Sequence, residues 1–196
     1  MVSSGENAVP APFLHAGDPL VVVTYDPGWP LTFRAEASRM RQVLGEVALR
    51  IDHIGSTAVP GLAAKPIIDI QIAVAAFEPL AAYRSPLEIL GYTFRADNPD
   101  RTKRYFRESA GTRRTHIHVR RHGSWSEQFA LLFRDFLRCD PQQAEEYAAL
   151  KLALVQQDGH DWQGYTDAKG PSIWAIMRQA SDWSQDVGWE PGPSDA

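Results

Sequence analysis

Cysteine is almost absent from this sequence, which has a single one, Cys139, in 196 residues. One thiol cannot form a disulfide within the chain, and it cannot supply a CxxC motif or a thiolate zinc site. Such sparse use of cysteine is typical of proteins that work in a reducing compartment. We therefore expect a cytoplasmic protein.

Long hydrophobic runs and an excess of basic residues are also missing. No run of about 18 apolar residues occurs, which argues against a membrane span, and the first residues lack the pattern of a secretory signal. Lys and Arg number 20 against 24 Asp and Glu, so the formal net charge is −4. We therefore expect neither a membrane nor a nucleic acid as a partner, although basic residues gather between Arg101 and Arg121, where a local anion site could form.

Hydrophobic residues make up 44% of the chain, enough for a sizeable core at this length. Residues 1–18 are rich in Pro, Ala and Ser, and we expect a flexible tail there. A similar composition predicts a second flexible tail at 184–196. Residues 19–183 are then expected to form one domain.

The pattern of apolar residues predicts both strands and helices. Helices are expected after Pro30, near 77–90, and from Ser126, Pro141 and about Thr166 or Pro171. Alternating or β-branched runs predict strands at 20–24, 50–54, 66–74, 92–95, 103–108 and 114–120. This order predicts an α+β fold, with a mixed β-sheet flanked by helices and a helical C-terminal third.

The stretch HIGSTAVPGLAAKPIIDI, residues 53–70, sets a Gly-Ser turn shortly before an apolar strand that carries an acid. Such a turn presents backbone N–H groups and hydroxyls, at Gly55, Ser56 and Thr57, which suit a phosphate. Asp69 is expected beside the turn, where its carboxylate can hold a divalent cation. The alternative is a plain turn next to a carboxylate that is hydrogen-bonded by local backbone.

The same stretch resembles the signature of the GrpB family, a branch of the nucleotidyltransferase superfamily. Similar motifs continue over about residues 20–180: Thr115 to Val119 as a His-x-His strand, Phe133 to Arg138, Tyr147 with Lys151, and Tyr165 with Lys169. The resemblance implies a nucleotidyltransferase-like sheet core, in which a Gly-Ser motif precedes a strand with catalytic carboxylates.

The sequence departs from the superfamily's pattern two residues after Asp69. A second carboxylate belongs there, and Gln71 offers a neutral oxygen instead, as a substrate contact. His116 and His118 share one strand face, and the resemblance places them where the superfamily has a third carboxylate. Asp69, His116 and His118 are therefore the expected catalytic residues and metal ligands, a set that favours Zn²⁺, Mn²⁺ or iron over Mg²⁺. The alternative is a histidine pair that only hydrogen-bonds Asp69.

Four basic residues are candidates for binding phosphate: Lys65, Arg104, Lys151 and Lys169. The last two each follow a tyrosine by four residues, which puts each pair on one face of a helix and makes Tyr147 and Tyr165 candidate substrate contacts. Aromatic rings covered by lysine stems are the alternative. His53 is expected to touch substrate or to orient the Gly-Ser turn through a hydrogen bond.

Two further groups are expected to have structural roles. Trp125, Trp162 and Trp174 are predicted to pack in the core or at helix junctions. Arg134 and Asp135 are predicted to form an ion pair.

The resemblance implies an enzyme that binds a nucleoside triphosphate with a divalent metal, Mg²⁺ or Mn²⁺ with Zn²⁺ as an alternative. It would transfer a nucleotidyl group to a small-molecule acceptor or activate the acceptor as an adenylate. One alternative is a non-catalytic nucleotide-binding accessory module, since the family's domain also occurs fused to some dephospho-CoA kinases. Another is a metal-dependent enzyme that uses the Asp and His residues without a nucleotide. The acceptor, the base and the oligomeric state stay open.

Overall fold

The computed structural model describes residues 20–157 and 162–196, so the tail expected at 1–18 lies outside the described residues. Five strands form one sheet in the order β1-β2-β5-β4-β3. Their bounds are β1 Arg50–Ile54, β2 Ile68–Val74, β3 Tyr92–Phe94, β4 Arg104–Glu108 and β5 Thr115–Arg121. The central pair β2 and β5 is parallel and the other pairs are antiparallel. The mixed sheet and the α+β class are confirmed.

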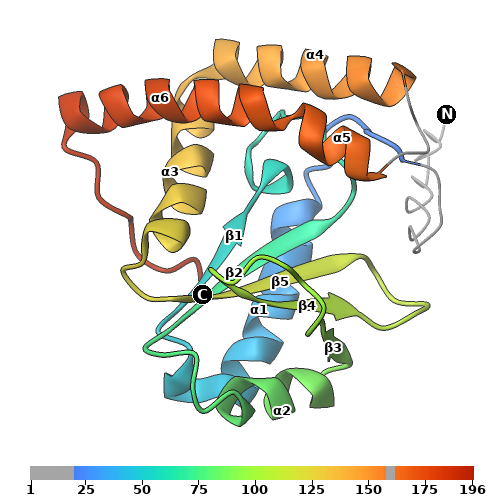
Figure 1. Ribbon diagram of the computed structural model, residues 1–196, viewed down its shortest axis with the longest axis vertical. Helices are drawn as coiled ribbons and strands as arrows, with labels where there is room; N and C mark the ends of the chain where they lie inside the picture. Colours follow the sequence, from blue (N-terminus) through green and yellow to red (C-terminus); the bar gives the residue numbers. More distant parts are fainter. Residues whose placement is uncertain (1–19, 158–161) are drawn as a thin grey trace, which may run out of the picture.

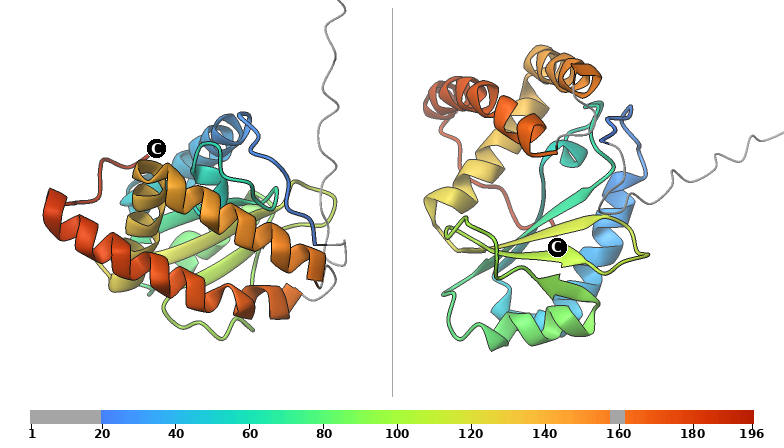
Figure 2. Two further views of the ribbon diagram at one scale, coloured as in Figure 1. Left: turned by 90° about the horizontal axis from the view of Figure 1, so that it is seen from above. Right: turned by 45° about the vertical axis from the view of Figure 1, so that its right-hand side comes forward.

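Helices lie on both sides of this sheet (Figure 1). Their bounds are α1 Trp29–Leu44, α2 Ala81–Ile89, α3 Trp125–Cys139, α4 Pro141–Gln157, α5 Trp162–Ala168 and α6 Gly170–Val187. Helices α1 and α2 share the main hydrophobic core with the sheet. Helices α3, α4 and α6 form a second core with the loop after β1, and Figure 2 shows α4, α5 and α6 gathered at one end of the molecule. The helical C-terminal third is thus confirmed.

Helix α1 illustrates how the sequence directs the first core. Pro30 lies in the first turn, where its missing N–H costs nothing. Phe33, Ala37, Met40 and Leu44 are buried at helical spacing, so that they form one stripe against the sheet.

Strand β2 divides its side chains between two environments. Ile68, Ile70 and Ile72 are buried in the main core. Asp69 and Gln71 alternate with them and therefore point to the opposite face of the sheet. The parallel register pairs Asp69 with His116 of β5, which is how residues 47 positions apart come together.

The C-terminal residues differ from the flexible tail expected at 184–196. Helix α6 continues to Val187 and ends at Gly188, whose φ is 64°. The chain then returns to the free edge of β1, where the amide of Ile51 donates to Ser194 Oγ and the amide of His53 donates to a carboxylate oxygen of Asp195. Local composition could not predict this, because the partners belong to a distant strand.

Helix α3 begins one residue before the expected cap. Ser124 is the N-cap, and its hydroxyl accepts a hydrogen bond from the amide of Glu127 at 3.3 Å. Within the described residues, no helix combines the length and hydrophobicity that a membrane span needs.

Candidate functional site

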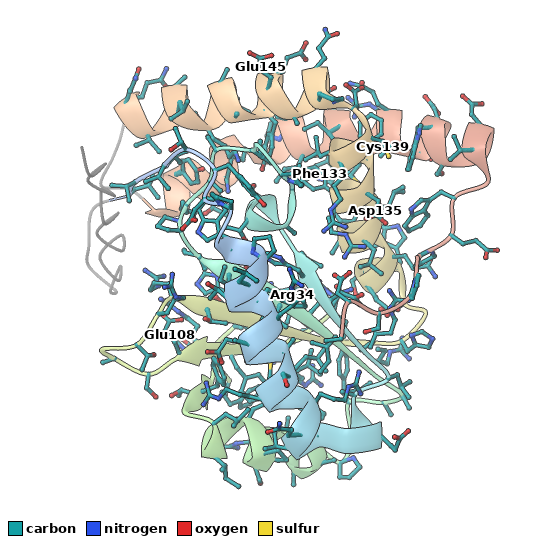
Figure 3. The ribbon with its side chains drawn as sticks, turned by 180° about the vertical axis from the view of Figure 1, so that it is seen from behind. Arg34, Glu108, Phe133, Asp135, Cys139 and Glu145 are labelled. Atoms are coloured by element: carbon teal, nitrogen blue, oxygen red, sulfur yellow. The ribbon has the colours of Figure 1, made fainter. Side chains whose placement is uncertain are left out.

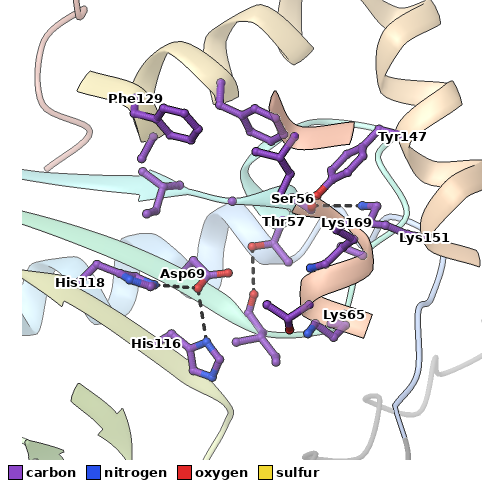
Figure 4. A pocket seen from close by; sticks show the side chains of 18 of the residues that line it. Ser56, Thr57, Lys65, Asp69, His116, His118, Phe129, Tyr147, Lys151 and Lys169 are labelled. Atoms are coloured by element: carbon purple, nitrogen blue, oxygen red, sulfur yellow. Dashed lines mark hydrogen bonds and ion pairs between the residues drawn. The ribbon is translucent and has the colours of Figure 1, made fainter. Parts of the chain in front are cut away.

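A cavity of about 410 Å³ lies between the sheet and the helical end of the molecule. The Gly-Ser turn and the side chains of β2 and β5 form its floor, while helices α3, α4, α5 and α6 contribute the remaining walls. Figure 4 shows these side chains turned toward one another. Of the expected site residues it is lined by Gly55, Ser56, Thr57, Lys65, Asp69, His116, His118, Tyr147, Lys151, Tyr165 and Lys169.

One carboxylate and two imidazoles meet on the cavity floor. His118 Nε2 lies 3.0 Å and His116 Nδ1 3.4 Å from the same oxygen of Asp69 (Figure 4). One donor atom from each residue lies within 4.8 Å of the other two. The side chains keep 28%, 19% and 13% of their surface exposed for Asp69, His116 and His118, so the group is open to the cavity rather than sealed in the core.

The charge states of this group suit metal binding. Burial alone would raise the pKa of Asp69, but hydrogen bonds from His116 and His118 lower it far below its ordinary value. Burial is the main reason that the pKa of His118 falls to about 3. A carboxylate is thus next to a neutral imidazole at pH 7, and both are in the form that binds a cation. Two nitrogen donors and one oxygen suit Zn²⁺, Mn²⁺ or iron, so the residues fit a divalent metal.

The Gly-Ser turn packs directly against this group. Gly55 has a φ of 71° and a ψ of −171°, a conformation almost restricted to glycine. A Cβ at this position would lie 2.8 Å from a carboxylate oxygen of Asp69. The absence of a side chain at Gly55 therefore lets the carboxylate approach the backbone of the turn.

His53 and Thr57 support the turn from behind. Thr57 donates its hydroxyl proton to the carbonyl of Ile67 at 3.1 Å, so His53 Nε2 donates to Thr57 Oγ1 at 3.0 Å. The imidazole stacks on Phe33 with 4.7 Å between ring centroids, and burial lowers its pKa to about 4. His53 does not line the cavity, which contradicts a direct substrate contact and agrees with an orienting hydrogen bond.

Three lysines line the cavity beside the group of Asp69: Lys65 from the loop before β2, Lys151 from α4 and Lys169 from the junction of α5 and α6. Lys151 Nζ lies 3.1 Å from Ser56 Oγ and also donates to the carbonyl of Ala63. Burial, with the neighbouring lysines, lowers the pKa of Lys151 to about 7 and that of Lys65 to about 8, and burial lowers the pKa of Lys169. Such crowded, desolvated ammonium groups would be stabilised by a bound anion.

The expected tyrosine–lysine pairs are also formed. Lys151 lies 4.8 Å from the ring centroid of Tyr147, and Lys169 lies 4.3 Å from that of Tyr165. Lys65 approaches the same ring of Tyr165 at 4.7 Å. Each ring thus supports ammonium groups through its π face while lining the cavity.

Arg104 and Gln71 do not line the cavity. Arg104 pairs with Val119, whose side chain is in the main core, and its guanidinium lies 4.2 Å from the ring centroid of Phe77 on that other face of the sheet. Gln71 is on the cavity face, but α3 covers it completely and its amide donates to the carbonyl of Glu127 at 3.3 Å. Both expectations were wrong. The alternation of side chains along a strand does not determine which face of the sheet a given side chain takes, or which element covers that face.

Arg120 is a cavity residue that the motifs did not single out. It follows His116 and His118 on the same face of β5, and its guanidinium donates to Gln71 Oε1. Burial lowers its pKa to about 10. Side chains two residues apart on a strand share a face, so Arg120, two residues after His118, could have been predicted to lie on the same face as the His-x-His motif.

Trp125 and Trp174 are 65% and 52% exposed, which contradicts core packing, but their indoles stack at the junction of α3 and α6, as the other expectation had it. The side chain of Trp162 lies outside the described residues. The expected ion pair is present, with Arg134 Nε 2.7 Å from a carboxylate oxygen of Asp135. Figure 3 shows Asp135 on α3.

Relatives of known sequence match most of this chain. A UPF0157 protein of Halalkalibacterium halodurans is 39% identical over 162 residues, which cover 83% of each chain. A UPF0157 protein of Bacillus subtilis and a dephospho-CoA kinase of Mycolicibacterium paratuberculosis are each 34% identical, and the matches cover 84% and 92% of this chain. The chain spans only 48% and 52% of these two relatives, about half their length.

A solved structure gives the same result at the level of the fold. The GrpB protein of Enterococcus faecalis aligns with a TM-score of 0.75 and 34% identity over 82% of this chain and 96% of that one. The Cid1 poly(U) polymerase aligns with a TM-score of only 0.48 and 14% identity, too low to support any argument. The family model described as GrpB protein matches residues 19–179. This chain therefore belongs to the GrpB family.

Proposed function

We propose that this protein binds a nucleoside triphosphate with a divalent cation and transfers the nucleotidyl group to a small-molecule acceptor, or activates the acceptor as an adenylate. The observation that carries the proposal is the arrangement of charge in one cavity. Asp69 and two imidazoles occupy one side, three lysines occupy the other, and Ser56 lies between them. A cation and a polyphosphate are the partners that satisfy both sides.

The three lysines are the proposed polyphosphate site. Lys65, Lys151 and Lys169 are held within one region by two aromatic rings and by Ser56. The amides of the Gly-Ser turn and the hydroxyl of Ser56 add hydrogen-bond donors next to Lys151. The attraction of a bound phosphate for the three ammonium groups would offset the repulsion between them.

Asp69, His116 and His118 are the proposed cation ligands. A divalent cation bound there would neutralise phosphate charge and orient the leaving pyrophosphate. In the transfer, the acceptor oxygen forms a bond to the α-phosphorus, the bond from the α-phosphorus to the bridging oxygen breaks, and pyrophosphate leaves. If Asp69 and only one imidazole hold the cation, the other imidazole would take the acceptor's proton instead.

Calorimetric titration of ATP with Mg²⁺ or Mn²⁺ tests the binding step. We expect binding by the native protein and a loss of about 100-fold or more in Asp69→Asn, since a neutral amide replaces the anionic cation ligand. Asp182→Asn, an exposed acid on α6, is the matched control and should bind as the native protein does. Equal affinities in all three proteins would remove Asp69 from the nucleotide site.

A second candidate is a metal-dependent enzyme that uses no nucleotide. The observation that favours it is the ligand set itself, with two imidazoles and with Gln71 buried under α3 where a second carboxylate would have been expected. Metal analysis of protein purified without chelator, together with the same titrations, separates the candidates. Tightly held zinc or iron without any affinity for nucleotide would favour this second function.

A non-catalytic nucleotide-binding module is the remaining alternative. It predicts nucleotide affinity that depends on the lysines but no release of pyrophosphate from the bound triphosphate. A pyrophosphate assay over a panel of small-molecule acceptors distinguishes it from the transferase.

A further inference from the structure

An aromatic cluster extends the cavity outward at the end away from the lysines. Phe129 of α3 lines the cavity (Figure 4), and its ring lies 4.9 Å from Trp125 and 5.5 Å from Trp174, between centroids. The two indoles are stacked at 6.0 Å with an interplanar angle of 20°. Helices α3 and α6 thus join at the cavity rim through three aromatic rings.

The two outer rings of this cluster are exposed to an unusual degree. Trp125 is 65% and Trp174 is 52% exposed, although a tryptophan normally covers much of its large apolar surface. Ile173, the neighbour of Trp174, also lines the cavity. The exposed indoles are therefore continuous with the cavity rather than isolated on a remote surface.

Arg120 supplies a charge at the cavity floor close to His118. Its Nε is buried and has no hydrogen-bond partner among the described residues, while another guanidinium nitrogen donates to Gln71. A buried donor without an acceptor costs free energy, and a ligand that supplies an anionic oxygen would remove that cost.

We propose that this end of the cavity is the subsite for the acceptor, and that the acceptor carries a planar ring with one anionic group. The ring packs against the indoles of Trp125 and Trp174, and the anionic group reaches Arg120. Only the identification of this ligand as the acceptor rests on the proposed function. The binding itself does not depend on it, because ring and anion would bind without nucleotide or metal.

Four small probes separate the two parts of the recognition. 4-Hydroxybenzoate and adenosine 5′-monophosphate carry a ring with a carboxylate or a phosphate, whereas 4-hydroxybenzamide carries the ring without charge and acetate the charge without the ring. We expect both charged ring compounds to bind in calorimetric titrations, and we expect the amide and acetate to bind at least about tenfold more weakly. Because the three lysines also bind phosphate in the proposed function, only the part of the affinity for adenosine 5′-monophosphate that Arg120→Gln removes reports a phosphate in this subsite.

Variants then assign the two interactions. The double variant Trp125→Ala with Trp174→Ala should weaken the binding of 4-hydroxybenzoate by about 5- to 100-fold, the range measured when a base loses its stacking on an aromatic side chain. Arg120→Gln should remove the preference for 4-hydroxybenzoate over 4-hydroxybenzamide. Ile89→Ala, an 81% exposed side chain on α2, is the control and should change neither affinity.

Two outcomes would overturn the proposal. One is that neither charged ring compound binds, even at millimolar concentration, to protein that unfolds cooperatively. The other is unchanged affinity in the double tryptophan variant, which would assign the indoles to a macromolecular contact instead. Absence of ATP binding by the native protein in the separate titrations, with ring binding intact, would refute the proposed function and leave this subsite standing.

Discussion

At the scale of single residues, the site depends on the close approach of Gly55 and Asp69. The turn needs a positive φ, and the carboxylate occupies the space that a Cβ would fill. Backbone conformation and cation site are therefore coupled through one missing side chain.

Gly55→Ala should destabilise the protein by about 2–4 kcal/mol, because about 1–3 kcal/mol of backbone strain adds to a contact with Asp69. Chemical denaturation measures the change. Gly61→Ala is the matched control, since Gly61 also has a positive φ, 79°, but has no atom within 4 Å of an added Cβ. Equal losses in the two variants would show that the carboxylate contact contributes nothing.

The lowered pKa of Lys151 leads us to expect opposite pH trends for anion affinity and for the stability of the protein. The pKa of Lys151 in the folded protein is about 7, below the ordinary value of 10.5. Between pH 7 and pH 10.5 the unfolded chain therefore binds more protons than the folded one. The stability of the ligand-free protein thus increases as the pH rises through this range. Anion affinity falls over the same rise, because the ammonium group loses its charge.

Sulfate, which does not titrate in this range, is the probe for the second trend. We expect its affinity to fall by roughly tenfold from pH 6 to pH 9. Lys151→Met should bind sulfate weakly at both values and should flatten the stability profile measured by denaturation. A native profile that stays flat from pH 7 to pH 10 would contradict the buried, depressed amine.

At the scale of elements, strand β5 shows how a period of two divides core from site. Ile117 and Val119 are fully buried in the main core, while His116, His118 and Arg120 line the cavity. Arg104 of the neighbouring strand pairs with Val119 and therefore belongs to the core face.

Lys169→Ala should weaken ATP binding by about tenfold, whereas Arg104→Ala should leave it unchanged. Arg104→Ala should instead cost about 0.5–1 kcal/mol of stability through its lost contact with Phe77. Paired calorimetry and denaturation on the two variants check both expectations. A large loss of nucleotide affinity in Arg104→Ala would contradict the observed face of β4.

At the scale of the whole molecule, the cavity joins two separately packed cores. Asp69 and the histidines come from the sheet, and Lys151 and Lys169 come from the helical end. The C-terminal residues add a further connection, because Arg134 Nη1 of α3 donates both to the carbonyl of His53 at 3.1 Å and to Asp195 at 2.8 Å. The end of β1, which leads into the Gly-Ser turn, is therefore held from outside as well.

Asp195→Asn should lower the stability by about 1–2 kcal/mol, since the buried guanidinium of Arg134 loses a charged partner. The loss should be smaller in Asp186→Asn, an exposed acid near the end of α6. Thermal unfolding of both variants measures the difference. Identical unfolding of the two would mean that the carboxylate of Asp195 contributes nothing to stability.

The sequence by itself determined most of the elements, although residues 20–24, expected as a strand, form only an isolated bridge at Val23. Its resemblance to the GrpB family implied the central group of Asp69, His116 and His118. Helical and strand periods are local, so they predicted β2, β5 and α1, and they placed His116 with His118 and Tyr147 with Lys151 on shared faces. The Gly-Ser turn lies close in sequence to Asp69, which made their proximity predictable as well.

The tertiary structure alone decided everything that depends on packing between distant segments. The way the two cores meet decides which face of the sheet Arg104 takes and that α3 covers Gln71. It also decides that Trp125 and Trp174 remain exposed and that the last residues return to β1. A period along one strand or helix fixes only which side chains lie together. It does not fix what lies opposite them, because the free energy of that contact is set by partners far away in the chain.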